Sequence, residues 1–202
     1  MQKIHFIKMH GLGNDFVIID NRLKKIKITK KIINKLSDRK SGAGCDQLIT
    51  INSTVKTEID AKIEIFNPSG DRAEACGNGT RCVAKLLFEE TKKNEIKILS
   101  DAGILKAIKK NDNHISVNLG KLSTEWKKIP LSENVDTLNV PIKIDGFTKG
   151  VAVNIGNPHI VFFGKNIKNV NLDIIGPTIE NNKLFKNKTN VEIIEIINNR
   201  KI

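Results

Sequence analysis

Short apolar runs bounded by turn residues dominate the first half of the chain, a pattern that predicts β-strands. The first two runs, residues 3–9 and 14–20, are rich in Ile, Val and Phe, and a Gly-rich turn at residues 10–13 joins them. We therefore expect the chain to open with a β-hairpin. Further strands are predicted at residues 47–52, 58–66, 95–100, 103–109 and 114–119.

Two segments of the first half carry apolar residues at helical spacing instead. One predicts an amphipathic helix over residues 29–40, with Thr29 as its N-cap. The other predicts a longer and more apolar helix from Asn78 to about Thr91. This second helix follows directly on Ala75-Cys76-Gly77, so we expect Cys76 to lie at its N-terminus.

The second half shows a similar but sparser pattern. Strands are predicted at residues 147–155, 159–163 and 189–197, and a helix at residues 171–181 with a break at Gly176-Pro177. The weakly patterned residues 122–141 indicate a connection, which places a domain boundary near residue 120.

A short internal repeat relates the two halves. Residues 13–18 (Gly-Asn-Asp-Phe-Val-Ile) align with residues 156–161 (Gly-Asn-Pro-His-Ile-Val), 143 positions further along the chain. This repeat predicts two similar domains. The counterpart of the Cys76 helix would fall near position 219, beyond Ile202, so we expect the second domain to be incomplete.

The amino-acid composition indicates a globular protein and bears on its partners. The 202 residues are 39% hydrophobic and 28% charged, which suits a globular chain, and no apolar run approaches the roughly 20 residues that span a bilayer. The net charge is +12, but the Lys and Arg residues are dispersed, and the chain has no Tyr and one Trp with which to stack bases. We therefore expect neither a membrane nor a nucleic-acid partner.

The cysteines and glycines indicate where chemistry could occur. Three cysteines, an odd number, indicate free thiols and a cytoplasmic location. At the start of a helix, free N–H groups favour the thiolate of Cys76, so two interpretations stay open: a reactive thiol beside an anion site, or a buried Cys in a Gly-rich turn. Cys45 and Cys82 are expected to be packing residues. No spacing suits a metal ion, and Gly11-x-Gly13 precedes a strand instead of the helix that a dinucleotide site needs.

Six motifs in one order carry a resemblance that covers nearly the whole chain. They are residues 8–16 (Lys-Met-His-Gly-Leu-Gly-Asn-Asp-Phe), 44–47 (Gly-Cys-Asp-Gln), 66–70 (Phe-Asn-Pro-Ser-Gly), 75–82 (Ala-Cys-Gly-Asn-Gly-Thr-Arg-Cys), 154–159 (Asn-Ile-Gly-Asn-Pro-His) and 189–191 (Thr-Asn-Val). With these motifs the chain resembles the diaminopimelate epimerases.

The resemblance implies an α+β fold of two pseudo-symmetric domains, each with a curved, antiparallel-rich sheet or barrel around a central helix. Residues 1–118 would form the first domain, nearly complete, and residues 119–202 an incomplete second domain. It also implies interconversion of LL- and meso-diaminopimelate without a cofactor, in lysine and peptidoglycan precursor synthesis. Two cysteines on opposite faces of the substrate Cα move the proton in this family.

The site residues are implied by the same motifs. Cys76 matches the first catalytic cysteine, and His159 matches the imidazole that assists it. Gly77 and Asn78 match the residues that hold the α-carboxylate. The polar substrate contacts are matched by Asn14, Gln47, Asn67, Asn157 and Asn190.

The second catalytic cysteine motif of the family is absent from the 202 residues, so we expect this chain to be a truncated, inactive form. Its expected partner is the small-molecule substrate, and a homodimer stays open. Two other interpretations also stay open: another cofactor-independent isomerase of the same fold, such as a proline racemase relative, or a catalytically dead basic binding module.

Overall fold

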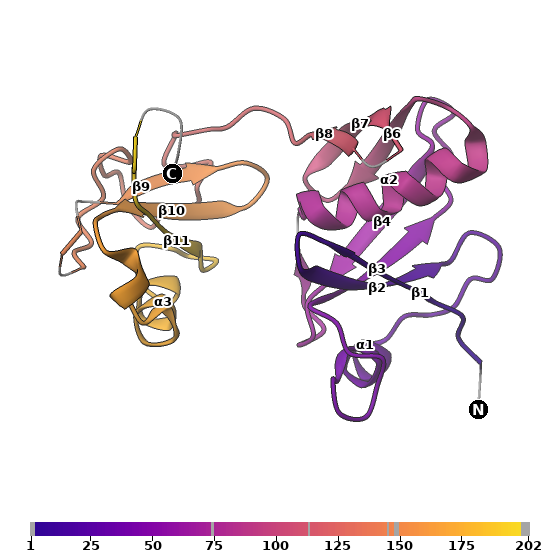
Figure 1. The fold of residues 1–202 in the computed structure, drawn as a ribbon, viewed down its shortest axis with the longest axis horizontal. Helices are drawn as coiled ribbons and strands as arrows, with labels where there is room; N and C mark the ends of the chain where they lie inside the picture. Colours follow the sequence, from indigo (N-terminus) through magenta and orange to yellow (C-terminus); the bar gives the residue numbers. More distant parts are fainter. Residues whose placement is uncertain (1–2, 74, 113, 145, 148–149, 199–202) are drawn as a thin grey trace. The chain divides into compact units, whose positions relative to one another are not determined.

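The computed structural model describes residues 3–73, 75–112, 114–144, 146–147 and 150–198. The chain divides into two compact units, Met1–Leu119 and Gly120–Ile202 (Figure 1). No helix among the described residues is long and apolar enough to cross a membrane.

The first unit is built on one mixed sheet of eight strands in the order β1-β2-β3-β4-β6-β7-β8, with the short β5 paired to β4. Neighbouring strands run antiparallel except for the parallel pairs β2·β3 and β4·β6. The strands are β1 (Ile7–Gly11), β2 (Asn14–Asp20), β3 (Gln47–Asn52), β4 (Ala61–Phe66), β5 (Arg72–Ala73), β6 (Glu95–Ser100), β7 (Gly103–Asn111) and β8 (His114–Asn118).

The helix α2 (Gly77–Thr91) lies against one face of this sheet (Figure 1). It contacts β1 and β8, which are the two edges of the strand order, as well as β2, β6 and β7 between them. A sheet whose two edges both reach one helix must curl around it. The core between them includes Phe16, Ile49, Val83 and Leu87, all at most 1% exposed.

The strand β2 is buried on both faces, which explains why its apolar run does not alternate with polar residues. Phe16 and Ile18 pack into the core below α2. Val17 and Ile19, which point to the opposite face, pack with Ile33 of the helix α1 (Lys30–Ser37). The two helices therefore cover opposite faces of the first strands.

The predicted hairpin is confirmed, since β1 and β2 pair antiparallel, and so is Thr29 as the N-cap of α1. The helix α1 ends at Ser37, earlier than predicted, because the Asp38 carboxylate accepts the N–H groups of Lys40 and Ser41 in a turn. The strand predicted from residue 58 begins at Ala61, because a turn joins Lys56 to Ile59. The strand β5 was not predicted from the sequence.

The second unit contains a three-stranded sheet in the order β11-β10-β9, formed by β9 (Val151–Asn154), β10 (Pro158–Phe163) and β11 (Asn190–Ile194). The short η1 (Ile167–Asn169) and the helix α3 (Leu172–Glu180) lie between β10 and β11 in the chain. The core of the unit includes Ile160, Phe162 and Phe185.

Two predictions for the second unit need correction. The helix α3 does not break at Gly176-Pro177. In this helix of nine residues the proline removes only one N–H donor, and the carbonyl of Pro177 still accepts the N–H of Asn181. The strand predicted over residues 147–155 forms at Val151–Asn154, and its residues 148 and 149 lie outside the described part of the chain.

The internal repeat has a structural counterpart. The strand β2 pairs antiparallel with β1 and parallel with β3, and α1 lies in the connection from β2 to β3. The strand β10 pairs antiparallel with β9 and parallel with β11, and α3 lies in the connection from β10 to β11. The two units therefore share one strand topology at their repeated segments.

Candidate functional site

Cys76 is the N-cap residue of α2. Its backbone is extended, and its Sγ accepts the N–H of Gly79 at 3.4 Å. The thiol therefore takes the place that an oxygen-bearing side chain takes at most helix starts. Gly77 and Asn78 occupy the first two helical positions, where N–H groups have no acceptor within the helix. This helix start thus presents a thiol beside N–H donors that no carbonyl of the helix accepts.

The side chain of Asn14, at the start of β2, contacts the Cys76 thiol. Its Oδ1 lies 3.6 Å from Cys76 Sγ. Its Nδ2 donates to Asp46 Oδ2 at 3.0 Å. The amide of Asn14 therefore lies between a thiol and a carboxylate.

The start of α2 favours the thiolate of Cys76, as expected, but burial has the larger effect. Burial raises the pKa of the Cys76 thiol above its ordinary value of 9.0. The N–H groups of Gly79 and Asn78 and the charge of Arg81 act in the opposite direction but do not outweigh burial, and Asp46 raises the pKa further. The net effect of these surroundings therefore favours the neutral thiol over the thiolate.

Gln47 and Asn67 lie side by side because β3 begins where the antiparallel β4 ends. Gln47 Nε2 donates to Asn67 Oδ1 at 3.0 Å. Gln47 Oε1 is buried and has no hydrogen-bond partner among the described residues. An acceptor in this state is suited to a donor group from a bound molecule.

A charged network borders Asn14. Asp15 forms ion pairs with Lys8 at 2.8 Å and with Arg39 at 2.7 Å, and Arg39 also pairs with Asp46 at 2.7 Å. Hydrogen bonds from Arg39, assisted by Lys8, hold the pKa of Asp15 well below its usual range despite its partial burial. These groups surround an open cavity of about 440 Å³, lined by Lys8, Met9, His10, Gly13, Asp15, Arg39 and Asp46.

The other two thiols are in the interior. Cys45 is 2% exposed, and its Sγ lies 3.4 Å from the Ser37 hydroxyl. It belongs to the apolar cluster on the face of β2 that packs against α1. Cys82 is 4% exposed in the core between α2 and the sheet, where burial raises its pKa. Cys76, by comparison, is half-buried.

The second unit gathers the other predicted site residues. His159 on β10 has its Nδ1 2.7 Å from Glu192 Oε1 and its Nε2 2.9 Å from Asn157 Oδ1. Asn190, the first residue of β11, pairs with His159 in the sheet register and donates its side-chain amide to the carbonyl of Pro158. His159, Asn157 and Asn190 are therefore neighbours at one end of the parallel pair.

The repeat relates the two groups position by position. Asn157 lies 143 residues after Asn14, and each residue opens or immediately precedes the repeated strand. The same separation relates Gln47 to Asn190, which both begin the parallel partner of that strand. The structure therefore gathers the predicted residues as two groups, one in each unit, at equivalent places of a repeated topology.

Three residues of these groups were missed from the sequence. Asp46 binds Asn14, Glu192 binds His159, and Arg81 donates to the Asn78 side chain. A signal existed for each of them. Asp46 stands inside the motif of residues 44–47, and Arg81 stands inside the motif of residues 75–82. Glu192 is two positions after Asn190, which places the side chains of these two residues on one face of a strand.

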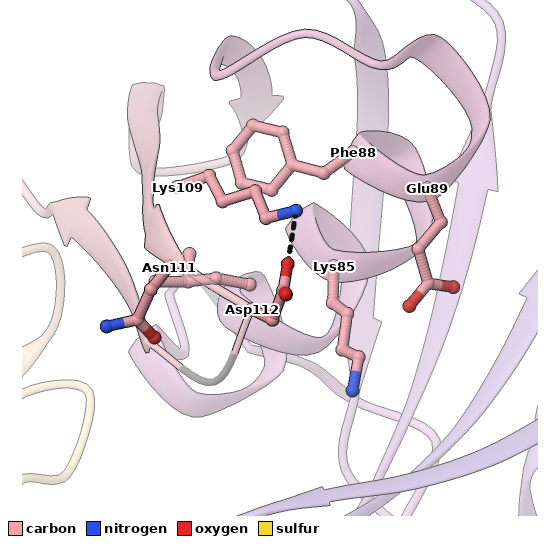
Figure 2. Close-up of a pocket in the computed structure, with 7 residues that line it drawn as sticks. Lys85, Phe88, Glu89, Lys109, Asn111 and Asp112 are labelled. Carbon is pink, nitrogen blue, oxygen red and sulfur yellow. Dashed lines mark ion pairs between the residues drawn. The ribbon is translucent and has the colours of Figure 1, made fainter.

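A second cavity of about 260 Å³ lies beside the C-terminal half of α2. In Figure 2 the Lys109 amine and the Asp112 carboxylate point toward each other, and they form an ion pair of 2.8 Å. Two lysines and two carboxylates line this cavity together with Phe88, Asn111 and Ile115, so neither charge dominates, and none of the predicted site residues is among them. Within the described ranges no three His, Cys, Asp or Glu side chains gather as a metal site would require.

Sequence comparisons relate the chain to one family. The profile of diaminopimelate epimerase matches residues 6–125. The diaminopimelate epimerase of Pelagibacter ubique (strain HTCC1062) is 46% identical over 200 residues, which covers 96% of this chain and 72% of that protein. The enzyme of the same name from Sphingopyxis alaskensis is 44% identical over 191 residues, covering 95% of this chain and 68% of that protein.

Solved structures show the same fold at low identity. A PhzF-family phenazine biosynthesis protein of Bacillus anthracis matches with a TM-score of 0.60 and 17% identity over 99% of this chain and 70% of that chain. A hydroxyproline epimerase from Agrobacterium vitis matches with a TM-score of 0.54 and 16% identity, over 87% of this chain and 54% of that chain. The curled mixed sheet around a helix is common to this fold.

Proposed function

Because the chain belongs to the diaminopimelate epimerase family, a family of amino-acid isomerases in lysine biosynthesis, we propose that it binds diaminopimelate and that Cys76 exchanges a proton with the substrate Cα. The observation that carries the proposal is the half-buried thiol at the N-cap of α2, beside Asn14. A thiol in this place combines an acid/base group with adjacent N–H donors.

The start of α2 is proposed to hold the α-carboxylate. The N–H groups of Gly77 and Asn78 have no intrahelical acceptor, and the positive end of the helix dipole attracts an anion. Proton removal from Cα leaves negative charge that spreads onto this carboxylate. Donors already fixed at that position stabilise the charge without rearrangement, which a reaction without a cofactor requires.

The remaining predicted residues are proposed to orient the substrate. The buried Gln47 Oε1, which has no partner among the described residues, would accept an N–H from a substrate amino group. Further polar contacts are assigned to Asn14, Asn67, Asn157 and Asn190. His159 is proposed to assist Cys76, as the family resemblance implies.

One acid/base thiol is proposed to come from these 202 residues. Inversion at Cα needs one group on each face of the substrate, and Cys45 and Cys82 are both buried in apolar clusters. We therefore propose that the 202-residue protein does not interconvert the isomers when it is assayed by itself. We also propose that residues 1–118 form the first epimerase domain, that residues 119–202 belong to a second one, and that the protein works in the cytoplasm.

Substrate protection of Cys76 tests the binding. The 202-residue protein is treated with limiting iodoacetamide, and the labelled peptides are quantified by mass spectrometry. We expect meso- or LL-diaminopimelate to slow the labelling of Cys76, and cadaverine, which lacks both carboxylates, to leave it unchanged. Equal labelling rates at saturating diaminopimelate would contradict the proposed substrate.

A turnover assay tests the number of acid/base groups. We expect meso-diaminopimelate in heavy water to yield no LL isomer at a rate ordinary for an enzyme, because removing one member of an acid/base pair costs orders of magnitude in rate. Rapid conversion by the 202-residue protein that disappears in Cys76→Ala would show that these residues hold both groups.

A further inference from the structure

We propose that Asp46 is a positioning residue that holds Cys76 in its neutral thiol form by fixing the side-chain amide of Asn14. This inference rests on the proposed role of Cys76 as an acid/base group and extends it by naming what sets its resting protonation state. Asp46 is not among the residues that the family resemblance implied.

The contact with Asp46 fixes the orientation of the Asn14 amide. An ionised carboxylate accepts hydrogen bonds and cannot donate one. Because Asp46 Oδ2 lies 3.0 Å from the terminal group of Asn14, that group must be the NH₂. The Asn14 carbonyl is thereby turned toward Cys76, and its Oδ1 lies 3.6 Å from Sγ.

This orientation discriminates between the two forms of the thiol. A carbonyl oxygen accepts the S–H of the neutral form but repels the lone pairs of the thiolate. Were the amide reversed, its NH₂ would instead donate to the thiolate and favour it. The Asp46 carboxylate therefore decides which form Asn14 stabilises, although it is one residue removed from the thiol.

Asp46 is itself held on a rigid frame. Its Oδ2 also accepts the N–H of Asp15 at 2.9 Å, and its Oδ1 accepts from Arg39 at 2.7 Å. Its own N–H donates to Asp15 Oδ1 at 2.8 Å and to the Asp15 carbonyl at 3.0 Å. A carboxylate with these contacts has little freedom to turn away from Asn14.

The groups acting on Cys76 come from three elements. From α2, the N–H groups of Gly79 and Asn78 and the charge of Arg81 favour the thiolate, and the Cys82 thiol is a neighbouring titrating group. Burial and Asp46, which precedes β3, favour the thiol, and Asn14 of β2 adds its carbonyl. Asn14 and Asp46 thus oppose the effect of the helix start.

The test is the pH profile of Cys76 alkylation in the protein without substrate. In Asp46→Asn the charge is lost and the new side chain can present either an oxygen or an NH₂ to Asn14. We expect the midpoint of the profile to move to lower pH, so that below the midpoint Cys76 labels about three to ten times faster than in the wild type. An unchanged or higher midpoint would overturn the proposal.

Two further variants distinguish the effect of Asp46 on the orientation of Asn14 from the effect of its charge. Asp15→Asn makes the same change of charge in the same network, but its side chain does not bind the Asn14 amide, so we expect a smaller shift. In an Asn14→Ala background, Asp46→Asn should add little to the shift that Asn14→Ala already causes. Equal shifts from both aspartates, or a full further shift in the Asn14→Ala background, would assign the effect to charge and overturn the role of Asn14.

The buried thiols report whether each variant is folded. Cys45 and Cys82 stay unlabelled in the folded protein, so their labelling identifies a variant that has opened. If the Asp46→Asn variant is unfolded, the Asn14→Ala variant provides the test, because it leaves the contacts among Asp46, Asp15 and Arg39 intact. A lower midpoint for Cys76 in Asn14→Ala supports the proposal, and an unchanged midpoint overturns it. Since no diaminopimelate is used, the outcome is independent of the proposed substrate.

Discussion

His159 on β10 and Glu192 on β11 are diagonal neighbours on one face of the parallel pair, and Nδ1 of the first lies 2.7 Å from Oε1 of the second. Glu192 stands opposite Val161, two positions beyond the residue that pairs with His159. Because the other ring nitrogen is 2.9 Å from Asn157 Oδ1, both nitrogens of the imidazole have partners. The ring is therefore fixed in its plane by two strands and the turn before them.

This contact predicts the effect of removing Glu192. Glu192→Ala deletes the acceptor at Nδ1, and we expect it to lower the free energy of unfolding of the second unit by about 1 kcal/mol. Glu192→Gln, which keeps an acceptor oxygen, is the matched control and should cost less. Urea unfolding followed by the fluorescence of Trp126, the one tryptophan of the sequence, measures both. Equal losses in the two variants would show that the hydrogen bond contributes nothing.

Cys76 should be the thiol that iodoacetamide labels first. It is half-buried, whereas Cys45 and Cys82 are 2% and 4% exposed. Because burial raises the pKa of Cys76 above 9.0, its labelling should be slow near neutral pH and should accelerate as the pH rises toward and beyond that value. Peptide mapping by mass spectrometry after limited reaction measures the order. Faster labelling of Cys45 or Cys82 in the folded protein would contradict this assignment.

Two glycines in helices should both resist replacement by alanine, for different reasons. A Cβ at Gly79 would lie 2.6 Å from Ile49 Cδ1 and 3.2 Å from Phe16 Cε1, so Gly79→Ala should destabilise the first unit by about 1–3 kcal/mol. A Cβ at Gly176 in α3 meets no atom within 4 Å outside its chain neighbours, but Pro177 disfavours a helical backbone for a preceding residue that carries a Cβ, so Gly176→Ala should not stabilise the second unit. Urea unfolding by circular dichroism and by Trp126 fluorescence distinguishes the units. A neutral Gly79→Ala would mean that Ile49 repacks freely.

The Asp15 network should make stability depend on acidic pH. The pKa of Asp15 is lowered in the folded protein, so the unfolded chain binds its proton first as the pH falls. The stabilisation from Asp15 is therefore complete above its ordinary value of 3.8 and is lost progressively below it. Urea midpoints of the wild type and Asp15→Asn should accordingly differ at neutral pH and converge in acid. A difference that does not change with pH would contradict the lowered pKa.

The local elements were predictable because their signals lie within a few residues. Alternating or continuous apolar runs and Gly-rich turns predicted the β1–β2 hairpin, and helical spacing predicted α2 with Cys76 at its start. The motifs also predicted which residue types belong to the site. Such signals act through backbone geometry and the direction in which each side chain points.

The pairing of strands and the state of the thiol depended on segments far apart in the chain. Residues 14, 46 and 76 meet because β2 and β3 pair in parallel and α2 packs beneath them, and no local pattern encodes that meeting. A pattern at the start of a helix favours a thiolate at Cys76, but burial by the surrounding sheet reverses the preference. Local sequence therefore determined where the thiol lies on its helix, whereas tertiary packing raises its pKa, because desolvation depends on everything that surrounds a group and not only on its neighbours in the chain.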